Sequence, residues 1–188
     1  MHIINEVNIM KSTKITTIQN ALYILSRFKE AHGAYMPSWK YSVQGLDPDK
    51  TAIASGRDLR IKPKTSREIC HSLKGMKLED AKKFLNDVID RKRAVPYYRY
   101  RGKTPHRKGL QGHDAGRFPE KAAGEILKIL DSVEANAEFK GLYSDRLRIV
   151  HMAAHKARVI RKFIPRAFGR ASPYYKHLTH IEVAVEEY

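Results

Sequence analysis

The sequence contains a single cysteine and no long apolar run, and each absence excludes a class of protein. Cys70 alone cannot form a disulfide scaffold, so we expect it to be a small buried residue. No stretch approaches the roughly 18 consecutive apolar residues of a membrane-spanning helix. The opening residues, MHIINEVNIMKSTK, lack the basic start and apolar segment of a secretory signal. We therefore expect a cytoplasmic protein with one modest core and no membrane partner.

Acidic residues are also scarce in two parts of the chain. The sequence carries 36 Lys and Arg against 20 Asp and Glu, a formal net charge of +16. Residues 91–117 contain nine cations and one acid, Asp114, and residues 146–181 contain nine cations and no acid. Elsewhere acids such as Glu68 and Glu79 share segments with lysines, as on solvated helix faces. Because so large a surplus is self-repulsive, it favours a polyanionic partner over a merely solvated surface.

Hydrophobic periodicity predicts three helices in the middle of the chain, over residues 66–74, 77–91 and 119–141. Thr65 or Ser66 is the expected N-cap of the first, and Pro119 suits the first turn of the third. The buried stripe of the third helix is predicted to be Ala122, Ala123, Ile126, Leu127, Leu130, Val133 and Ala137.

Extended structure is predicted on either side of these helices. Residues 51–61 are expected to be extended but irregular, with Gly56 interrupting them. Beyond Asp145 the apolar period falls to two, which indicates two long strands. One strand places Leu147, Ile149, His151 and Ala153 on one face, and the other does the same with Ile181, Val183 and Val185.

Residues 1–35 differ in composition from the rest, being nearly balanced in charge. Their apolar residues from Ile15 to Phe28 share a helical stripe, which indicates a short amphipathic helix. The alternative is that Met36 is the natural start and that the preceding segment has no folded role. We therefore expect an N-terminal extension over residues 1–35 and a single domain over residues 36–188.

Catalytic motifs are absent from the sequence. His151 and His155 have the spacing of two metal ligands on a helical turn, but the glutamate of a zinc hydrolase motif is missing and the local period is that of a strand. The glycines form no P-loop, and no Ser, Cys or Thr lies in a nucleophile elbow. We expect these histidines to pack in a sheet or lie near phosphates, and we expect no catalytic residue, metal, cofactor or small-molecule substrate. An enzyme is the third-ranked hypothesis.

Aromatic rings alternate with cations in both cation-rich segments. Residues 97–101, YYRYR, lie in a long stretch without a sustained period that we interpret as a basic loop over residues 91–117. Tyr174 and Tyr175 precede Lys176 in the second segment. Such rings can stack on bases while the cations pair with phosphates. The alternative is that two or three of the tyrosines pack on the body of the protein.

The second cation-rich segment predicts a long β-hairpin. If residues 155–162 and 174–185 pair antiparallel, the hairpin is about 45 Å long at roughly 3.3 Å per residue. A bare two-stranded ribbon is marginal in water, so an anionic environment would have to order it. Gly169 permits a compact turn between Arg166 and Arg170, whose guanidinium groups suit phosphate. The tip is therefore predicted to thread between RNA elements.

Four segments resemble, in order, the archaeal and eukaryotic branch of the large-subunit ribosomal protein twenty-two family. They are HDAGRFPEKAA (113–123), HMAAHKA (151–157), PRAFGRASPYYK (165–176) and HIEVAVEE (180–187). The resemblance extends from about residue 37 to the end, and residues 1–35 lie outside it. It implies an α+β fold, with a small antiparallel sheet packed against three helices and a protruding hairpin over about residues 147–187.

The resemblance also implies a structural protein, not an enzyme, of the large subunit of cytoplasmic ribosomes. Such a protein binds large-subunit rRNA, supports assembly and lines the nascent-peptide exit tunnel with its hairpin tip. Its partners would be rRNA, neighbouring large-subunit ribosomal proteins and the nascent peptide. The corresponding tip residues are Phe163, Ile164, Pro165, Arg166, Ala167, Phe168, Gly169 and Arg170. The expected rRNA-binding residues are Lys62, Lys64, Arg67, Arg91, Lys92, Arg93, Tyr98, Arg99, Arg101, Lys103, Arg107, Lys108, Arg117, His155, Lys156, Arg158, Arg161, Lys162, Arg166, Arg170, Tyr174, Tyr175 and Lys176.

A second hypothesis from another class is an architectural DNA-binding protein. Such proteins share basic β arms and an apolar wedge with a proline at the tip. Nuclease sensitivity separates the two, because RNase and not DNase should release a ribosomal protein from its native assembly.

Overall fold

A computed structural model of the chain describes residues 40–110 and 112–188. Contacts between residues divide the chain into two units, residues 1–40 and a compact unit from Tyr41 to Tyr188. The helix predicted within residues 1–35 and the alternative start at Met36 lie outside the described residues. No helix in the described ranges is both long and apolar enough to cross a membrane.

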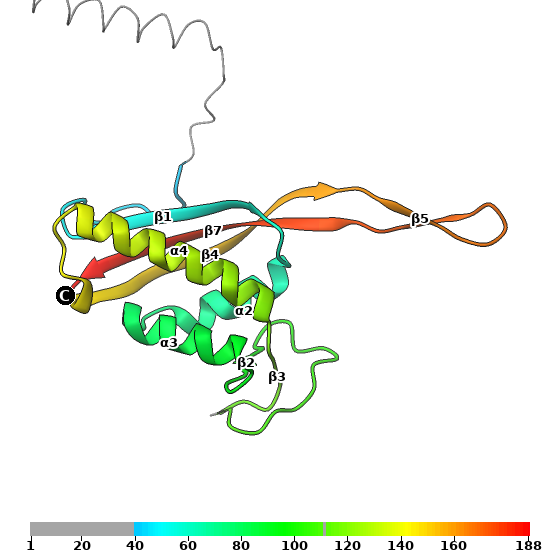
Figure 1. The fold of residues 1–188 in the computed structure, drawn as a ribbon, viewed down its shortest axis with the longest axis horizontal. Coiled ribbons are helices and arrows are strands. Elements are labelled where there is room, and N and C mark those ends of the chain that lie inside the picture. Colours follow the sequence, from blue (N-terminus) through cyan, green and yellow to red (C-terminus); the bar gives the residue numbers. More distant parts are fainter. Residues whose placement is uncertain (1–39, 111) are drawn as a thin grey trace, which may run out of the picture. The chain divides into compact units, whose positions relative to one another are not determined.

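The compact unit consists of a three-stranded antiparallel sheet, three α-helices and a projecting ribbon (Figure 1). Its elements are β1 (Thr51–Leu59), α2 (Pro63–Leu73), α3 (Leu78–Ile89), β2 (Val95–Pro96), β3 (Gly116–Arg117), α4 (Glu120–Phe139), the 3-10 turn η1 (Ser144–Arg146), β4 (Leu147–Ile160), β5 (Phe163–Pro165), β6 (Ala171–Pro173) and β7 (Lys176–Glu187). The strand order is β1-β7-β4, so β7 is the central strand. The predicted α+β class, with its small antiparallel sheet and three helices, is confirmed.

The core lies between this sheet and the helices. Helix α4 packs on β1, α2 packs on β4, and α3 packs on α4. Ile69 and Leu73 from α2, Leu85 from α3, Ile126 and Leu130 from α4, and Ile149 and Ile181 from the sheet are fully buried. Burial of such side chains, at about 1.5–3 kcal/mol each, is the main source of stability that the sequence offers.

The first helix begins earlier than its predicted cap. Pro63 occupies the first helical position and Lys62 is the N-cap, whereas Ser66 is buried and its hydroxyl donates to the carbonyl of Lys62 at 3.0 Å. Proline suits this position because its fixed φ is helical and the first N–H groups have no helical partner in any case. The prediction of Thr65 or Ser66 as the cap was therefore wrong.

Strand β1 is regular up to Gly56 and irregular beyond it, where Asp58 has a φ of 50°, so the predicted irregularity is confined to its last residues. It pairs with β7 from Thr51 opposite Glu186 to Gly56 opposite Ile181, and the register changes only beyond Gly56. A Cβ on Gly56 would lie 2.5 Å from Cδ1 of Ile129. The glycine therefore permits close packing of α4 on β1 and does not interrupt the strand.

Two other burial predictions also differ from the structure. A bulge between Ile149 and His151 shifts the alternation of β4, so that Met152 is buried where His151 and Ala153 were expected. In α4, Ile129 is fully packed and Leu127 is only half-buried. An extra residue in one strand reverses the inside and outside faces beyond it, and the sequence carries no sign of this.

The ribbon continues the two longest strands away from the body (Figure 1). β4 and β7 pair from Leu147 opposite Glu187 to Ile160 opposite Lys176, and β5 and β6 extend the pairing to Pro165 opposite Ala171. At the tip Phe168 and Gly169 both have positive φ, of 57° and 65°. Gly169 adopts this conformation freely, whereas Phe168 does so at a steric cost.

Candidate nucleic-acid interface

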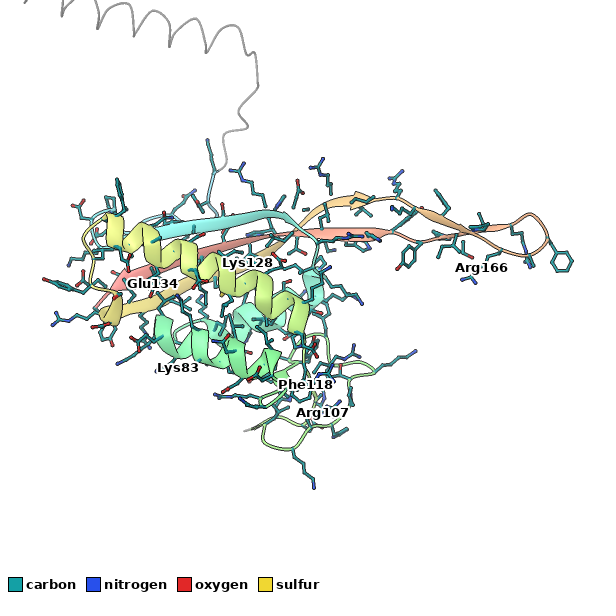
Figure 2. All side chains as sticks on the ribbon, in the orientation of Figure 1. Lys83, Arg107, Phe118, Lys128, Glu134 and Arg166 are labelled. Carbon is teal, nitrogen blue, oxygen red and sulfur yellow. The ribbon has the colours of Figure 1, made fainter. Side chains whose placement is uncertain are left out.

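The outer half of the ribbon presents cations with no acid beside them. Arg161, Lys162, Arg166 and Arg170 are exposed and, within the described ranges, none of them has an acidic partner. Arg158, closer to the body, bonds to Asp58 at 2.7 Å. Figure 2 shows Arg166 out on the ribbon, remote from Lys83 and Lys128 on the helices. The outer ribbon is thus an unbalanced positive surface.

Lys176, at the root of the ribbon, feels the charge of other cations. The Arg60 guanidinium lowers the pKa of Lys176 below its ordinary value, and desolvation, Lys162 and Lys121 act in the same direction. Arg60 follows β1 and Lys121 lies in the first turn of α4, so both are distant in sequence from the ribbon. Neither was among the predicted binding residues, because only the fold brings them to this place.

The basic loop of residues 91–117 is held to the body by contacts of its own. Strands β2 and β3 pair within it, so it is not wholly irregular. Most of its cations have partners on the protein. Arg91 pairs with Glu120, Lys92 with Asp90 and Arg101 with Asp114, while Arg93, Arg107 and Arg117 lie over the rings of Phe84, Phe118 and Tyr97. Figure 2 shows Arg107 beside Phe118.

Three cations of this loop, Arg99, Lys103 and Lys108, are exposed and have no ion pair among the described residues. The ion pairs of the other loop cations are mostly exposed, and such pairs contribute only about 0–1 kcal/mol. A phosphate can therefore compete for either group of cations.

The predicted tyrosines divide between packing and exposure. Tyr97 is buried on the body, and burial raises the pKa of its hydroxyl. Tyr98 lies between the rings of His71 and His113, with centroids 4.8 and 4.4 Å away, and remains 47% exposed. Tyr174 and Tyr175 on the ribbon are also exposed. The packing alternative therefore holds for Tyr97 and for Tyr100, which packs against the core, while the Tyr98 ring is already stacked on two histidines. Tyr174 and Tyr175 keep exposed rings on which a base can stack.

The start of α2 adds the remaining predicted cations next to this loop. Lys62 and Lys64 are exposed, and the Lys64 ammonium lies 5.3 Å from the centre of the Tyr100 ring. Arg67 lies 3.6 Å from the carboxylate of Glu68. Glu68 itself is fully buried, so its assignment to a solvated face was wrong.

His151 and His155 lie on the sheet face opposite the helices, around a buried carboxylate. Glu182 Oε2 accepts hydrogen bonds from the hydroxyl and the backbone N–H of Ser42, at 2.6 and 2.9 Å. His151 Nε2 is 3.2 Å from the same hydroxyl, and His155 Nε2 is 3.7 Å from Glu182 Oε2. Both histidines thus lie in the sheet, which is one of the two expected alternatives, and the side chain of His155 stays 43% exposed. Within the described ranges no group of three or more His, Cys, Asp or Glu side chains is arranged to hold a metal.

The buried Cys70 is not suited to act as a nucleophile. Cys70 is buried in α2, as predicted, and burial raises the pKa of its thiol to about 12. The thiolate, which is the reactive form, is therefore negligible at neutral pH.

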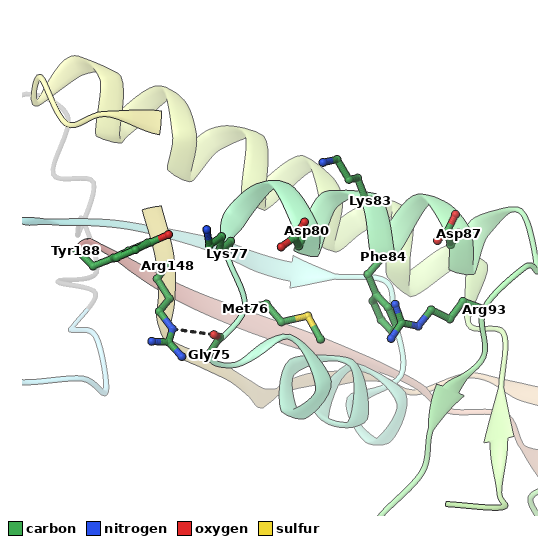
Figure 3. Close-up of a pocket in the computed structure, with 10 residues that line it drawn as sticks. All are labelled: Gly75, Met76, Lys77, Asp80, Lys83, Phe84, Asp87, Arg93, Arg148 and Tyr188. Atoms are coloured by element: carbon green, nitrogen blue, oxygen red, sulfur yellow. Dashed lines mark hydrogen bonds between the residues drawn. The ribbon is translucent and has the colours of Figure 1, made fainter. Parts of the chain in front are cut away.

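A cavity of about 710 Å³ runs along one side of α3, from Tyr188 to Arg93 (Figure 3). Arg93 lies over the Phe84 ring, and Arg148 Nε donates to the Gly75 carbonyl at 2.8 Å. Asp80 and Asp87 also line this cavity. Arg93 is its only predicted binding residue, and the mixed charge distinguishes it from the ribbon.

The fold and the charges together define a class: a small α+β body that presents an unbalanced cationic ribbon. The family described as ribosomal protein L22p/L17e matches residues 54–186. Three relatives, each named large ribosomal subunit protein uL22, are similar to this chain. That of Methanopyrus kandleri is 57% identical over 79% of this chain and 96% of its own length, that of Methanococcus vannielii is 51% identical with the same shares, and that of Ignicoccus hospitalis is 49% identical over 81% and 99%.

The chain belongs to the ribosomal protein L22p/L17e family. The predicted family and the structural role in the large ribosomal subunit are thereby confirmed, and so is the prediction that the chain is not an enzyme. The archaeal relatives agree with the predicted branch and with a location in cytoplasmic ribosomes.

Proposed function

We propose that this chain binds large-subunit rRNA through two surfaces, the ribbon and the basic loop. The observation that carries the proposal is the outer ribbon, where the exposed Arg161, Arg166 and Arg170 have no acidic partner among the described residues. Phosphates supply that countercharge, and the release of their counterions drives binding. Arginine suits this role because its guanidinium donates several hydrogen bonds in one plane.

The ribbon tip is proposed to line the nascent-peptide exit tunnel and to help assemble the subunit. Phe163, Ile164 and Phe168 are exposed at the tip, Phe168 by 92%. Phe163 meets the ring of Tyr175 edge-on at 6.0 Å, and the apolar surface that the tip leaves exposed favours contact with an apolar or aromatic surface. The nascent peptide and neighbouring large-subunit proteins are the proposed partners besides rRNA. Residues 36–188 are proposed to act as one domain, with residues 1–35 as an extension.

Charge reversal tests the role of the ribbon. The variant carrying Arg161→Glu, Arg166→Glu and Arg170→Glu should fold, since all three side chains are exposed, but should fail to enter large subunits. A matched control reverses Lys50, Lys83 and Lys128, which are also exposed but lie outside the proposed interface. Sedimentation of lysates followed by mass spectrometry measures incorporation. Equal incorporation of the two variants would reject the proposal.

Nuclease treatment separates RNA from DNA as the partner. We expect RNase, and not DNase, to release the chain from its native assembly. Release by DNase alone would favour the architectural DNA-binding hypothesis instead.

A further inference from the structure

Glu68 is a fully buried acid whose carboxylate faces the basic loop. It lies in the middle of α2, and its Oε2 accepts a hydrogen bond from the backbone N–H of Tyr98 at 3.0 Å. Its Oε1 accepts from the N–H groups of Arg99 and Tyr100, at 3.2 and 3.1 Å. Three successive backbone amides of residues 98–100 therefore converge on one side chain.

These amides are the principal countercharge of Glu68. The nearest cation, Arg67 Nη1, is 3.6 Å from Oε1, and this nitrogen has no hydrogen-bond partner among the described residues. A buried carboxylate is costly unless it is hydrogen-bonded, so its burial requires the loop to stay in place. Successive backbone N–H groups commonly form a concave binding site for an anion, and here the protein fills that site with its own carboxylate.

The two tyrosine side chains of the same segment are held by contacts of their own, and Tyr100 packs against the core. Tyr98 is stacked between His71 and His113, and Lys64 lies over the ring of Tyr100. Arg99, between them, is exposed. The amides of residues 98–100 thus donate to Glu68, while the side chain of Arg99 stays exposed before any RNA is bound.

We propose that Glu68 is a positioning residue for RNA recognition: its buried carboxylate holds residues 98–100 in the conformation that presents Arg99 to a phosphate backbone. This inference rests on the proposed rRNA binding. The expected change in RNA affinity is opposite to that from net charge alone, because removing an acid from a cationic protein should strengthen RNA binding by simple attraction. Here the loss of the Glu68 charge should weaken RNA binding, because the loop would no longer be held in one conformation. If the loop adopts the binding conformation about a tenth of the time, the apparent Kd rises about tenfold.

The test compares Glu68→Gln with Glu138→Gln in the full chain. Both variants lose one negative charge, but Glu138 is exposed on α4 and outside the loop. Binding to purified large-subunit rRNA at fixed salt should be about tenfold weaker for E68Q and no weaker for E138Q. Arg99→Ala should weaken binding in the wild type and have a smaller effect in E68Q, because the Arg99 contact is already impaired there.

Hydrogen exchange gives a readout that does not depend on RNA. In the free wild-type protein the amides of residues 98–100 should be protected, and in E68Q they should exchange at least about tenfold faster while the core of β7 stays protected. Unprotected amides in the wild type would overturn the inference even if E68Q does not fold. Equal rRNA binding by E68Q and E138Q would overturn the positioning role alone, whereas a wild type that does not bind rRNA would remove the proposed function as well.

Discussion

The buried carboxylate of Glu182 contributes to the free energy of unfolding in a way that depends on pH. Burial would raise its pKa, but the hydrogen bonds from Ser42, together with His155 and His151, outweigh burial and lower it. A lowered carboxyl pKa stabilises the fold above the ordinary value of 4.5, and this contribution is lost as pH falls through the lower folded pKa. The pKa of His151 is also lowered, from 6.5, because burial disfavours the charged imidazolium. The neutral form that the fold favours is therefore lost on acidification, and stability falls with it.

We therefore predict that the free energy of unfolding declines as the pH is lowered below about 6.5, with Glu182 responsible for the most acidic part. Glu182→Gln should cost about 1–3 kcal/mol at pH 7, the range for a hydrogen-bonded charge, and much less near pH 3. Urea denaturation between pH 3 and pH 7 measures this. A penalty that stays constant over that range would show that the charge of Glu182 is irrelevant.

Gly56 and Gly124 are predicted to respond to alanine in opposite directions. A Cβ at Gly56 meets the Ile129 side chain at 2.5 Å, so Gly56→Ala should destabilise the protein by about 1–3 kcal/mol through overpacking. A Cβ at Gly124, within α4, meets nothing within 4 Å, so Gly124→Ala should stabilise it by up to about 1 kcal/mol. Thermal unfolding of the two variants beside the wild type measures both. Similar melting temperatures would contradict the packing of α4 on β1.

At the scale of elements, the helices followed from the sequence more closely than the strands did. The apolar stripe of residues 77–91 was predicted from local spacing, and α3 runs from Leu78 to Ile89. The bulge after Ile149 and the fit of Gly56 against Ile129 depend on partner elements, so local spacing could not reveal them. The same holds for the site. The cations of the ribbon were visible as an acid-free run, whereas the approach of Arg60 to Lys176 and the burial of Glu68 depend on tertiary contacts.

The ribbon should be far less stable than the sheet from which it extends. Beyond Ile160 its strands are exposed on both faces and pair with no third strand of the described ranges, and isolated two-stranded ribbons are marginal in water. We predict rapid hydrogen exchange over residues 161–175 in the free protein, slow exchange at Ile181 and Val183, and protection of the ribbon once rRNA is added. A ribbon already protected in the free protein would contradict this account of its order.

For the whole molecule, charge is separated between the ribbon and the helices. Lys82 in α3 bonds to Asp131 and Glu134 in α4, both at 2.6 Å, so this face neutralises its own cations. The cations of the outer ribbon have no such acidic partners among the described residues. We therefore expect the molecule to approach RNA with its ribbon and basic loop, and with α3 and α4 turned away.

The salt dependence of binding measures how many phosphates the ribbon meets. Each phosphate contact contributes about 0.7–0.9 to the slope of log affinity against log salt concentration. Replacing Arg161, Arg166 and Arg170 with alanine should lower that slope by about 2–3 in titrations with large-subunit rRNA. Replacing Lys50, Lys83 and Lys128 with alanine should leave it unchanged. Equal slopes for the two triple variants would show that the ribbon arginines do not contact phosphates.

The position of β7 between β1 and β4 also dictates when the molecule can fold during synthesis. β1 begins at Thr51, yet among the described strands it pairs only with β7, which spans residues 176–187. The sheet therefore cannot close until more than a hundred further residues have been translated, and the helices have no completed surface to cover before then. Until that moment the core is incomplete, and the cations of a partly folded chain are open to association with any nucleic acid nearby.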